Sequence, residues 1–410
     1  MQIELLDIIY IFITLICLAS VGYLIVAIVA VEIFNRKRKL LDKAETFSPP
    51  VTILKPIYGL DPEMEENLRS FCKQDYPVYQ IIFGLQDKND PAIPIIKKII
   101  EEFKHIDVSY IVDQRLYGSN HKVSNLINMY PKAKYDYLLI ADSDMRVSQN
   151  YLANVMAPFA DKTVGAVTCL YSGSARGKLA SKLNSMFINE WFFPSVLISR
   201  FLSPIKYCLG ATMIVRRTVL DNMGGFKTLS DYLADDYMLG KYVVEQGYRI
   251  HLSDFVVENI VDEPSLKELV LHELRWARTL RTVEPVGFFF TFLTDTFVIT
   301  CAVAMEVYYY SGHPLLPLIP VLFVLAARLI LHKRTKHILN TKSAGSIWLV
   351  PLRDILSFSI RVISFAGNSV KWRNNSFSVD TAGLIHSEEP IQVELGTAKK
   401  IPGLATPQDY

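Results

Sequence analysis

Apolar residues form one long run near the N-terminus. From Ile8 to Phe34 the only charged residue is Glu32, close to the end of the run. This length exceeds the roughly 20 residues that a helix needs to cross the hydrocarbon core of a bilayer. Residues 8–34 are therefore predicted to form an N-terminal transmembrane helix.

A cleaved signal peptide is the competing interpretation of this run. Signal peptides carry basic residues before the apolar segment, whereas Glu4 and Asp7 precede this one and the cluster Arg36 to Lys39 follows it. Lysine and arginine collect on the cytoplasmic side of a membrane. The pattern thus favours an anchor whose following domain lies in the cytosol.

Further apolar segments follow residue 285. Val286 to Tyr310 and Pro314 to Leu331 predict a transmembrane hairpin over 286–331, in which charged residues should face protein, water or headgroups. Residues 343–367 mix charges such as Arg353 with leucine and isoleucine, which is typical of an amphipathic segment in the membrane interface. Residues 376–410 are expected to form a loosely ordered cytoplasmic tail.

Between these segments, residues 50–285 are long enough for one α/β domain. Predicted strands cover Val51–Leu54, Tyr79–Gln86, Val108–Val112, Tyr135–Ala141 and Val164–Leu170. Predicted helices cover Pro62–Phe71, Pro91–Phe103, Lys122–Met129 and Asn150–Phe159. This alternation predicts a mixed, mostly parallel sheet with helices on its faces, and ligands then bind beyond the carboxyl ends of the strands.

Composition agrees with a membrane-attached domain. Half of the 410 residues are hydrophobic (50%), and the mean hydropathy of +0.23 lies between soluble proteins and polytopic transporters. The net charge of +2 gives no basic field for a nucleic-acid partner. The five cysteines include no C-x-x-C pair, which argues against a disulfide framework or a zinc ribbon.

Several enzyme signatures are missing from the sequence. No G-x-G-x-x-G follows a strand, and Gly173 to Lys178 is one residue too short for a phosphate-binding P-loop. His272-Glu273 begins like a zinc-protease helix but lacks the second histidine at ligand spacing. Dehydrogenase, ATPase and zinc hydrolase functions therefore lose support.

Carboxylates at strand ends carry the candidate chemistry. Asp142-Ser143-Asp144 follows a strand directly, which suits a divalent cation shared with a diphosphate, or else a solvated turn. Asp87 also ends a strand and has the same turn alternative. Asp235 and Asp236 lie among apolar residues, where they are either a helix cap or a poised base.

Two further stretches combine charge or aromatic residues with helical spacing. Arg275 and Trp276 begin a basic run with Arg278 and Arg281, which is either a solvated helix face or a cationic site for a diphosphate. The aromatic stretch Leu179 to Leu202, which contains Trp191, either packs on the catalytic core or lies at the mouth of a lipid site.

At these residues the sequence resembles the ceramide glucosyltransferase family (GT21). That family has a GT-A catalytic domain with successive aspartate motifs and a Gln/Arg-x-x-Arg-Trp motif. The matching positions are Asp87, Asp142-Ser143-Asp144, Asp236 and His272-Glu273-Leu274-Arg275-Trp276, across about residues 50–285. His272 departs from the usual first residue of the last motif.

Three segments are especially similar to the bacterial hopanoid-biosynthesis branch of this family. They are the full Asp142-Ser143-Asp144, His121 to Met129 and His272 to Thr279. The resemblance implies an integral protein of a bacterial inner membrane with a cytoplasmic catalytic domain. Its substrates would be UDP-glucose or UDP-N-acetylglucosamine and a lipid acceptor, either ceramide or a hopanoid polyol.

The resemblance also implies roles for individual residues. Lys55, Pro56 and Asp87 would lie near the uracil, and Asp144, with Asp142 beside it, would hold Mg2+ or Mn2+ at the diphosphate. Asp236 would be the base of an inverting displacement. Arg275 and Lys122 would neutralise the departing UDP, Trp276 would floor the acceptor site, and Trp191 would lie near it. The competing interpretation of Lys122 is a residue on the surface of a helix.

Two other functions remain open from the sequence. A processive polysaccharide synthase shares the aspartates and the Arg-Trp motif, although it normally threads its polymer through several membrane helices. An inactive membrane scaffold with the same fold is the alternative of another class, and replacing Asp236 by Asn separates it from an enzyme.

Overall fold

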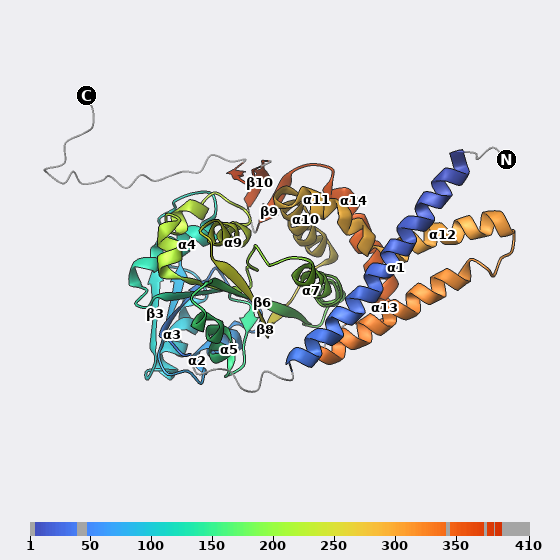
Figure 1. Cartoon of the computed structure of the whole chain (residues 1–410). Coiled ribbons are helices and arrows are strands. Elements are labelled where there is room, and N and C mark those ends of the chain that lie inside the picture. Colours follow the sequence, from blue (N-terminus) through green and yellow to red (C-terminus); the bar gives the residue numbers. More distant parts are fainter. Residues whose placement is uncertain (1–4, 39–46, 342–344, 373–374, 381, 388–410) are drawn as a thin grey trace, which may run out of the picture.

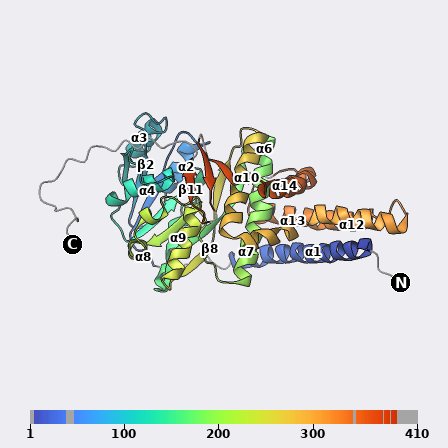
Figure 2. The same ribbon diagram turned by 90° about the horizontal axis from the view of Figure 1, so that it is seen from above.

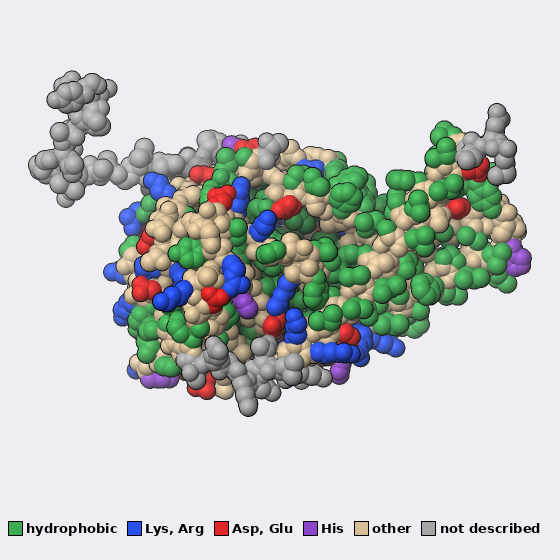
Figure 3. Space-filling model, in the orientation of Figure 1, with side chains coloured by type: hydrophobic (Ala, Val, Ile, Leu, Met, Phe, Trp, Pro, Cys, Tyr) green, Lys and Arg blue, Asp and Glu red, His purple; other side chains and the backbone are tan. Residues whose placement is uncertain are grey.

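The computed structural model describes residues 5–38, 47–341, 345–372, 375–380 and 382–387. A body built on a β-sheet lies at one end, and a bundle of long helices projects from the other (Figure 1). Figure 3 shows that apolar side chains cover the projecting bundle, whereas lysine, arginine, aspartate and glutamate gather on the sheet body. The two ends therefore present surfaces suited to different solvents.

An eight-stranded sheet forms the centre of the body. Its strands, in the spatial order β3-β2-β1-β4-β7-β6-β8-β5, are β1 (Val51–Pro56), β2 (Tyr79–Leu85), β3 (Asp107–Val112), β4 (Tyr137–Ala141), β5 (Met145–Arg146), β6 (Val164–Ala175), β7 (Thr212–Arg216) and β8 (Arg249–Val261). Strands β1 to β4 pair in parallel, as do β6 and β8, while β7 is antiparallel to both neighbours and β5 to β8. The sheet is thus mixed and mostly parallel, as predicted.

Helices cover both faces of this sheet. They are α2 (Met64–Cys72), α3 (Ile93–Glu102), α4 (His121–Met129), α5 (Tyr151–Met156), α8 (Arg217–Asn222) and α9 (Asp235–Glu245), with short 3-10 turns at Tyr130–Lys132, Ala157–Ala160 and Phe226–Leu229. Successive strand residues such as Ile53 and Leu54 point to opposite faces. Ile53 belongs to the apolar cluster that includes residues of α2, α3 and α5, and Leu54 to the one that includes residues of α4 and α9. These two apolar layers fix the sheet and hence the ends of its strands.

Three helices form the projecting bundle: α1 (Leu5–Arg38), α12 (Thr296–Ser311) and α13 (Leu318–Ile338). They lie side by side in both views (Figures 1 and 2). In the part of the chain that the structure describes, α1 alone is long and apolar enough to cross a membrane. The pair Pro285–Thr294 and Thr296–Ser311, bent by 58°, would together make a second span. The hairpin over 286–331 stays a prediction.

The remaining helices join the body to the bundle. They are α6 (Leu179–Phe187), the π-helical turn η3 (Ile188–Phe192), α7 (Phe193–Leu202), α10 (Leu266–Val283), α11 (Pro285–Phe290), η5 (Thr291–Thr294), η6 (Ile347–Leu349) and α14 (Val350–Ser364). The amphipathic segment predicted at 343–367 contains α14, which buries Arg353 and Arg361 and exposes Leu352, Ile355 and Val362. Its polar face therefore points into the protein and its apolar face points outward.

The C-terminal part of the described chain differs from the prediction. Strands β9 (Ser369–Trp372), β10 (Asn375–Val379) and β11 (Ile385–Ser387) form a separate antiparallel sheet. The expectation of a loosely ordered tail from residue 376 is wrong for this region, because alternate apolar residues such as Phe377 and Val379 are buried. Residues 388–410 of the predicted tail lie outside the described residues.

Candidate functional site

A cavity of about 1170 Å³ lies between the sheet and the joining helices. One end is lined by Pro56, which ends β1, and by Gln86, which follows β2. The other end is lined by Tyr23 of α1 and Thr294 of η5. The cavity therefore extends from the carboxyl ends of the parallel strands to the helices of the projecting bundle.

Asp142 and Asp144 enter this cavity directly after β4. Asn259 of β8 donates a hydrogen bond to Asp144 Oδ2 over 2.8 Å, while Asp144 Oδ1 is buried with no hydrogen-bond partner in the structure. Burial, followed by the charges of Asp142 and Asp61, raises the pKa of Asp144 to about 7. The site thus contains a carboxylate that a cation would stabilise.

These residues fit a shared metal ion better than a site made by protein ligands alone. Among the described residues there is no group of three or more histidines, cysteines or acids that could hold an ion. The free oxygen of Asp144, with Asp142 beside it, supplies part of a ligand set. A magnesium-type ion commonly takes one or two carboxylates and completes its shell with phosphate and water.

Two lysines contact Asp142, one at its carboxylate and one at its backbone carbonyl. Lys122 of α4 lines the cavity, and its Nζ lies 2.8 Å from Asp142 Oδ1. Burial opposes the charge of Lys122, but the nearby Asp142 and Asp235 outweigh it and keep the pKa of Lys122 above its usual value. Lys122 is therefore a site residue held as a cation.

Lys55 lies beneath the site instead of lining it. Its side chain is fully buried, donates to the carbonyl of Asp142 over 2.8 Å and lies over the ring of Phe71 at 3.6 Å. Burial lowers the pKa of Lys55 to about 7. The contact that Lys55 makes is with the backbone of the Asp142 turn.

The predicted uracil residues differ in their exposure. Pro56 lines the cavity, whereas Asp87 is exposed, lies outside the lining and accepts a hydrogen bond from the backbone of Asn89 over 2.9 Å. Its neighbour Gln86 lines the cavity and buries an amide nitrogen that has no partner in the structure. Sequence reasoning missed Gln86, although its place at the end of a predicted strand was a usable signal.

Asp235 and Asp236 begin α9 and line the cavity. A Cβ on Gly210 would lie 2.9 Å from Asp236 Oδ2, so a glycine at 210 leaves room for this carboxylate. Burial and the charge of Asp235 raise the pKa of Asp236 to about 6. Asp235 is 6% exposed, and its Oδ2 has no hydrogen-bond partner in the structure. Asp236 also accepts a hydrogen bond at Oδ1 from the N–H of Tyr237 over 2.8 Å, so it serves the first turn of α9 as well as lining the cavity.

Four residues of the motif on α10 line the cavity: His272, Glu273, Arg275 and Trp276. The Nδ1 of His272 lies 2.7 Å from Glu263 Oε1, and its ring lies 4.3 Å from that of Trp276. His272 thus supports the position of Trp276 through ring packing.

An aromatic stack extends the site toward the bundle. The ring of Phe187 lies 5.9 Å from that of Trp276 and 4.9 Å from that of Trp191. Trp191 lines the cavity and donates from Nε1 to Thr294 Oγ1 over 2.7 Å. Its neighbour Glu190 lies outside the cavity lining and contacts His332 of α13. The π-helical turn at 188–192 lets these two neighbouring side chains point in different directions, and such turns are frequent at functional sites.

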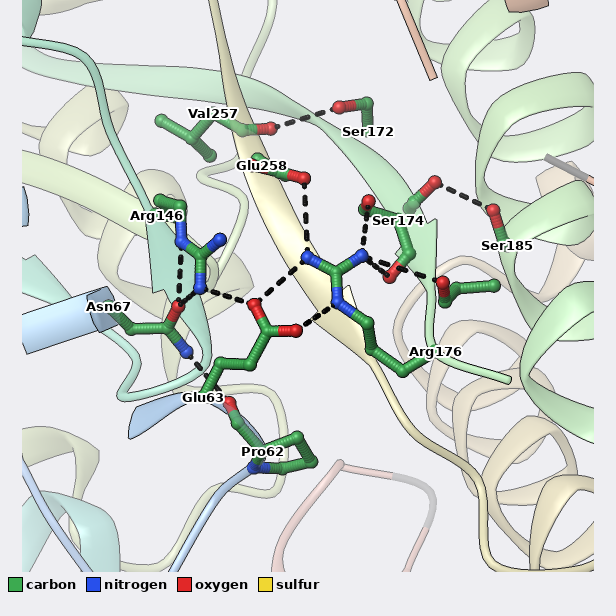
Figure 4. Close-up of polar contacts among 12 residues, drawn as sticks. Pro62, Glu63, Asn67, Arg146, Ser172, Ser174, Arg176, Ser185, Val257 and Glu258 are labelled. Carbon is green, nitrogen blue, oxygen red and sulfur yellow. Dashed lines mark hydrogen bonds and ion pairs between the residues drawn. The ribbon is translucent and has the colours of Figure 1, made fainter. Parts of the chain in front are cut away.

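A polar network holds the loop between β1 and α2 against the sheet (Figure 4). Glu63 accepts hydrogen bonds from Arg146 of β5, over 2.6 Å, and from Arg176 at the end of β6. The two hydrogen bonds lower the pKa of Glu63 to about 2, and the bond from Arg176 has the larger effect. Asp61 in the same loop accepts from Ser143, between the two site aspartates. Asp61 and Ser143 both line the cavity, so this loop places a third carboxylate beside the Asp142–Asp144 turn.

Comparisons with known proteins agree with this architecture. The family model of glycosyl transferase family 21 matches residues 12–385. Ceramide glucosyltransferase 3 of Caenorhabditis elegans is 22% identical over 357 residues, which cover 84% of this chain and 75% of the relative. Ceramide glucosyltransferase of Komagataella phaffii is 35% identical over 144 residues, 33% of this chain and 28% of the relative.

One solved structure has a similar fold over most of the chain. It is a mannosyltransferase from Pyrobaculum calidifontis in complex with GDP-Man and Mn2+. The TM-score is 0.50 at 18% identity, with 86% of this chain and 99% of the other covered. The predicted GT-A fold is confirmed.

Proposed function

The chain belongs to glycosyl transferase family 21, and from that premise we propose that it transfers a hexose from a UDP-sugar to the hydroxyl group of a membrane lipid. The sugar is glucose or N-acetylglucosamine, and the acceptor is ceramide or a hopanoid polyol. Relatives named ceramide glucosyltransferase support glucose and ceramide as the first pair to test. The reaction is a single displacement that inverts the anomeric carbon.

One observation carries this proposal. The same cavity is lined by Asp144 and Asp236 at the sheet and by Tyr23 and Thr294 on the apolar helices. A water-soluble donor and a lipid acceptor can then approach from opposite ends and meet beside Asp236. This arrangement favours a lipid acceptor over a soluble one.

The end of the cavity at the sheet suits UDP. Mg2+ or Mn2+ held by Asp144, with Asp142 beside it, would neutralise charge on the diphosphate. The mannosyltransferase of similar fold was solved with GDP-Man and Mn2+, which supports a nucleotide sugar and a metal here. Lys122 and Arg275 add fixed positive charge for the leaving group.

Asp236 is suited to accept the proton of the acceptor hydroxyl. Its pKa of about 6 leaves it ionised near neutral pH and more basic than an exposed aspartate. Gly210 leaves room at its Oδ2. Trp276 forms the wall next to the acceptor, and Trp191 continues that wall toward the bundle.

The surfaces also support attachment to a membrane. Basic residues Arg36, Lys37 and Arg38 end α1 on the side of the catalytic domain, so that domain faces the cytosol. The outward face of α14 and the strongly exposed Trp348, at 86%, are suited to the membrane interface. In a bacterium the membrane would be the inner one.

UDP release by the detergent-purified full chain tests the proposal. UDP-glucose and UDP-N-acetylglucosamine are each paired with ceramide and with a hopanoid polyol, with and without Mn2+ or Mg2+. We expect release that requires one donor, one lipid and a divalent cation, and that is lost in Asp236→Asn. Release that ignores the lipid, or no release from any pair, would reject the function.

A further inference from the structure

We propose that the C-terminal sheet, strands β9 to β11, is a working part of the catalytic site. It holds the segment 231–236 in place and contributes Phe377 to the wall of the cavity. This role rests on the proposed function, because it concerns the part of the cavity beside Asp236. Most of β10 and all of β11 lie in the segment from residue 376 that the sequence alone suggested was a loose tail.

Backbone contacts tie this sheet to the segment that leads into α9. The N–H of Ile385 donates to the carbonyl of Asp231 over 2.8 Å, and the N–H of Leu233 donates to the carbonyl of Gly383 over 3.2 Å. Between them, Tyr232 pairs with Leu384 as an antiparallel bridge. Tyr232 and Leu233 are therefore hydrogen-bonded to the C-terminal sheet like a further strand at its edge.

Apolar packing strengthens the same contact. Leu233 forms one buried cluster with four residues of the C-terminal sheet, namely Val370, Phe377, Val379 and Ile385. This cluster is separate from the two apolar layers of the main sheet. Phe377 is 4% exposed and also lines the cavity, as does Leu233, two residues before Asp235. Removing the Phe377 ring would open the wall and loosen the aspartate segment together.

The other edge of this region is tied to α10. Arg278 donates to the carbonyl of Ala366 over 2.8 Å and also to that of Ser369, and Arg281 donates to the carbonyl of Gly367 over 3.0 Å. These arginines follow Arg275 and Trp276 on the same helix. The C-terminal region thus contacts the segments that carry both the aspartate pair and the Arg-Trp motif.

Among the described residues of β9 to β11, Phe377 alone lines the cavity, and it belongs to the cluster with Leu233. None of these described residues contacts the donor end of the cavity. The sheet should therefore affect the transfer step and the acceptor without weakening UDP binding. A support that merely stabilised the whole domain would reduce both.

Three single variants of the full chain separate these cases. Phe377→Ala removes a wall and cluster side chain, Val379→Ala removes a cluster side chain outside the cavity lining, and Lys371→Ala changes an exposed residue of β9 as the matched control. The readouts are kcat and acceptor KM with the donor and lipid that the wild type uses, and the Kd for UDP by calorimetry with Mn2+.

We expect kcat to fall about 10- to 100-fold in Phe377→Ala and about fivefold in Val379→Ala, since small displacements of reacting groups carry costs of this size. The Kd for UDP should stay within about twofold in both, and Lys371→Ala should match the wild type. The proposed role of the C-terminal sheet would be overturned if both cluster variants kept the wild-type kcat. It would also be overturned if UDP affinity fell as much as turnover. Failure of the wild type itself to use any lipid would instead reject the proposed function.

Discussion

Buried charges differ in their pairing between the sheet body and the helices that join it to the bundle, here called the junction. At the sheet, Asp144 and Asp235 each keep a buried oxygen without a hydrogen-bond partner in the structure. At the junction, Arg353 makes a bidentate pair with Glu273 over 2.7 Å. The same is true of Arg361, which contacts both carboxylate oxygens of Asp295.

This difference separates residues suited to catalysis from residues that hold the fold together. A buried charge without a partner is costly, so it persists where a ligand or a reaction uses it. A buried pair costs little while both members are present and a great deal when one is removed. Changes in the sheet site should therefore remove activity and spare the fold, whereas breaking a charge pair at the junction should lower the stability of the fold.

The largest expected effect separates the two regions most clearly. Asp236→Asn keeps the shape of the side chain and removes the base, so turnover should fall about 10³-fold. The melting temperature should not fall, because a buried charge is removed at the same time. Lipid-dependent UDP release and thermal unfolding measure the two quantities. Turnover within tenfold of the wild type would show that Asp236 is not the base.

The second effect lies at the junction. Arg353→Met leaves the carboxylate of Glu273 buried and unpaired, which should cost about 3–5 kcal/mol of unfolding free energy. The double variant Arg353→Met with Glu273→Leu removes both charges and serves as the control. Thermal unfolding should show a large loss in the single variant and a partial recovery in the double. An unchanged melting temperature in Arg353→Met would contradict the structural role of the pair.

The third effect is the pH dependence of stability at the site. The folded-state pKa values of about 7 for Asp144 and about 6 for Asp236 lie above the unfolded value near 3.9. Their stabilising contribution is therefore complete below about pH 4 and is lost as the pH rises through 6 and 7. Asp144→Asn should raise the melting temperature at about pH 8 and leave it unchanged at about pH 4.

A divalent cation sharpens this test because it binds the charged form of the site. Mn2+ should raise the melting temperature of the wild type at about pH 8 and should have little effect on Asp144→Asn. Equal stabilisation of both proteins would remove Asp144 from the metal site.

The smallest effect lies where the two regions meet. Thr294→Val removes the acceptor of the Trp191 hydrogen bond while keeping the size of the side chain. A neutral hydrogen bond contributes about 1 kcal/mol, so acceptor KM should rise about fivefold. Donor KM should not change. Thr291→Val, one turn earlier in η5, is the comparison, because it removes a contact to Arg361, as Thr294→Val does, but none to Trp191. A change in donor KM alone would place Trp191 outside the acceptor end.

Local patterns were enough to predict much of the catalytic body. Strands β1 to β4 and β6 follow apolar runs with clear turn residues, and the end of β4 brings Asp142 and Asp144 to the cavity, which Asp236 reaches from the start of α9. Strands β7 and β8 were missed. Strand β7 is only five residues long, and β8 pairs with β6 through two shifts of register. Pairings of this kind leave little trace in a single segment.

Distant partners account for most of what the sequence did not predict. Arg278 and Arg281 read as a solvated face or a diphosphate site, but their partners are carbonyls more than 80 positions later in the chain. Phe377 gained its place from a sheet whose strands are too short to predict. Arg353 and Arg361 indicated an amphipathic segment, but their buried partners, Glu273 and Asp295, lie far away in the sequence and could not be predicted from it.

The most direct test of the account is the product itself. The wild type and Asp236→Asn are incubated with UDP-glucose, Mn2+ and either ceramide or a hopanoid polyol, and the lipids are analysed by mass spectrometry and NMR. The account predicts a lipid with one added hexose, whose anomeric configuration is opposite to that of the donor, from the wild type and almost none from the variant. A sugar polymer, a retained configuration or no modified lipid would contradict it.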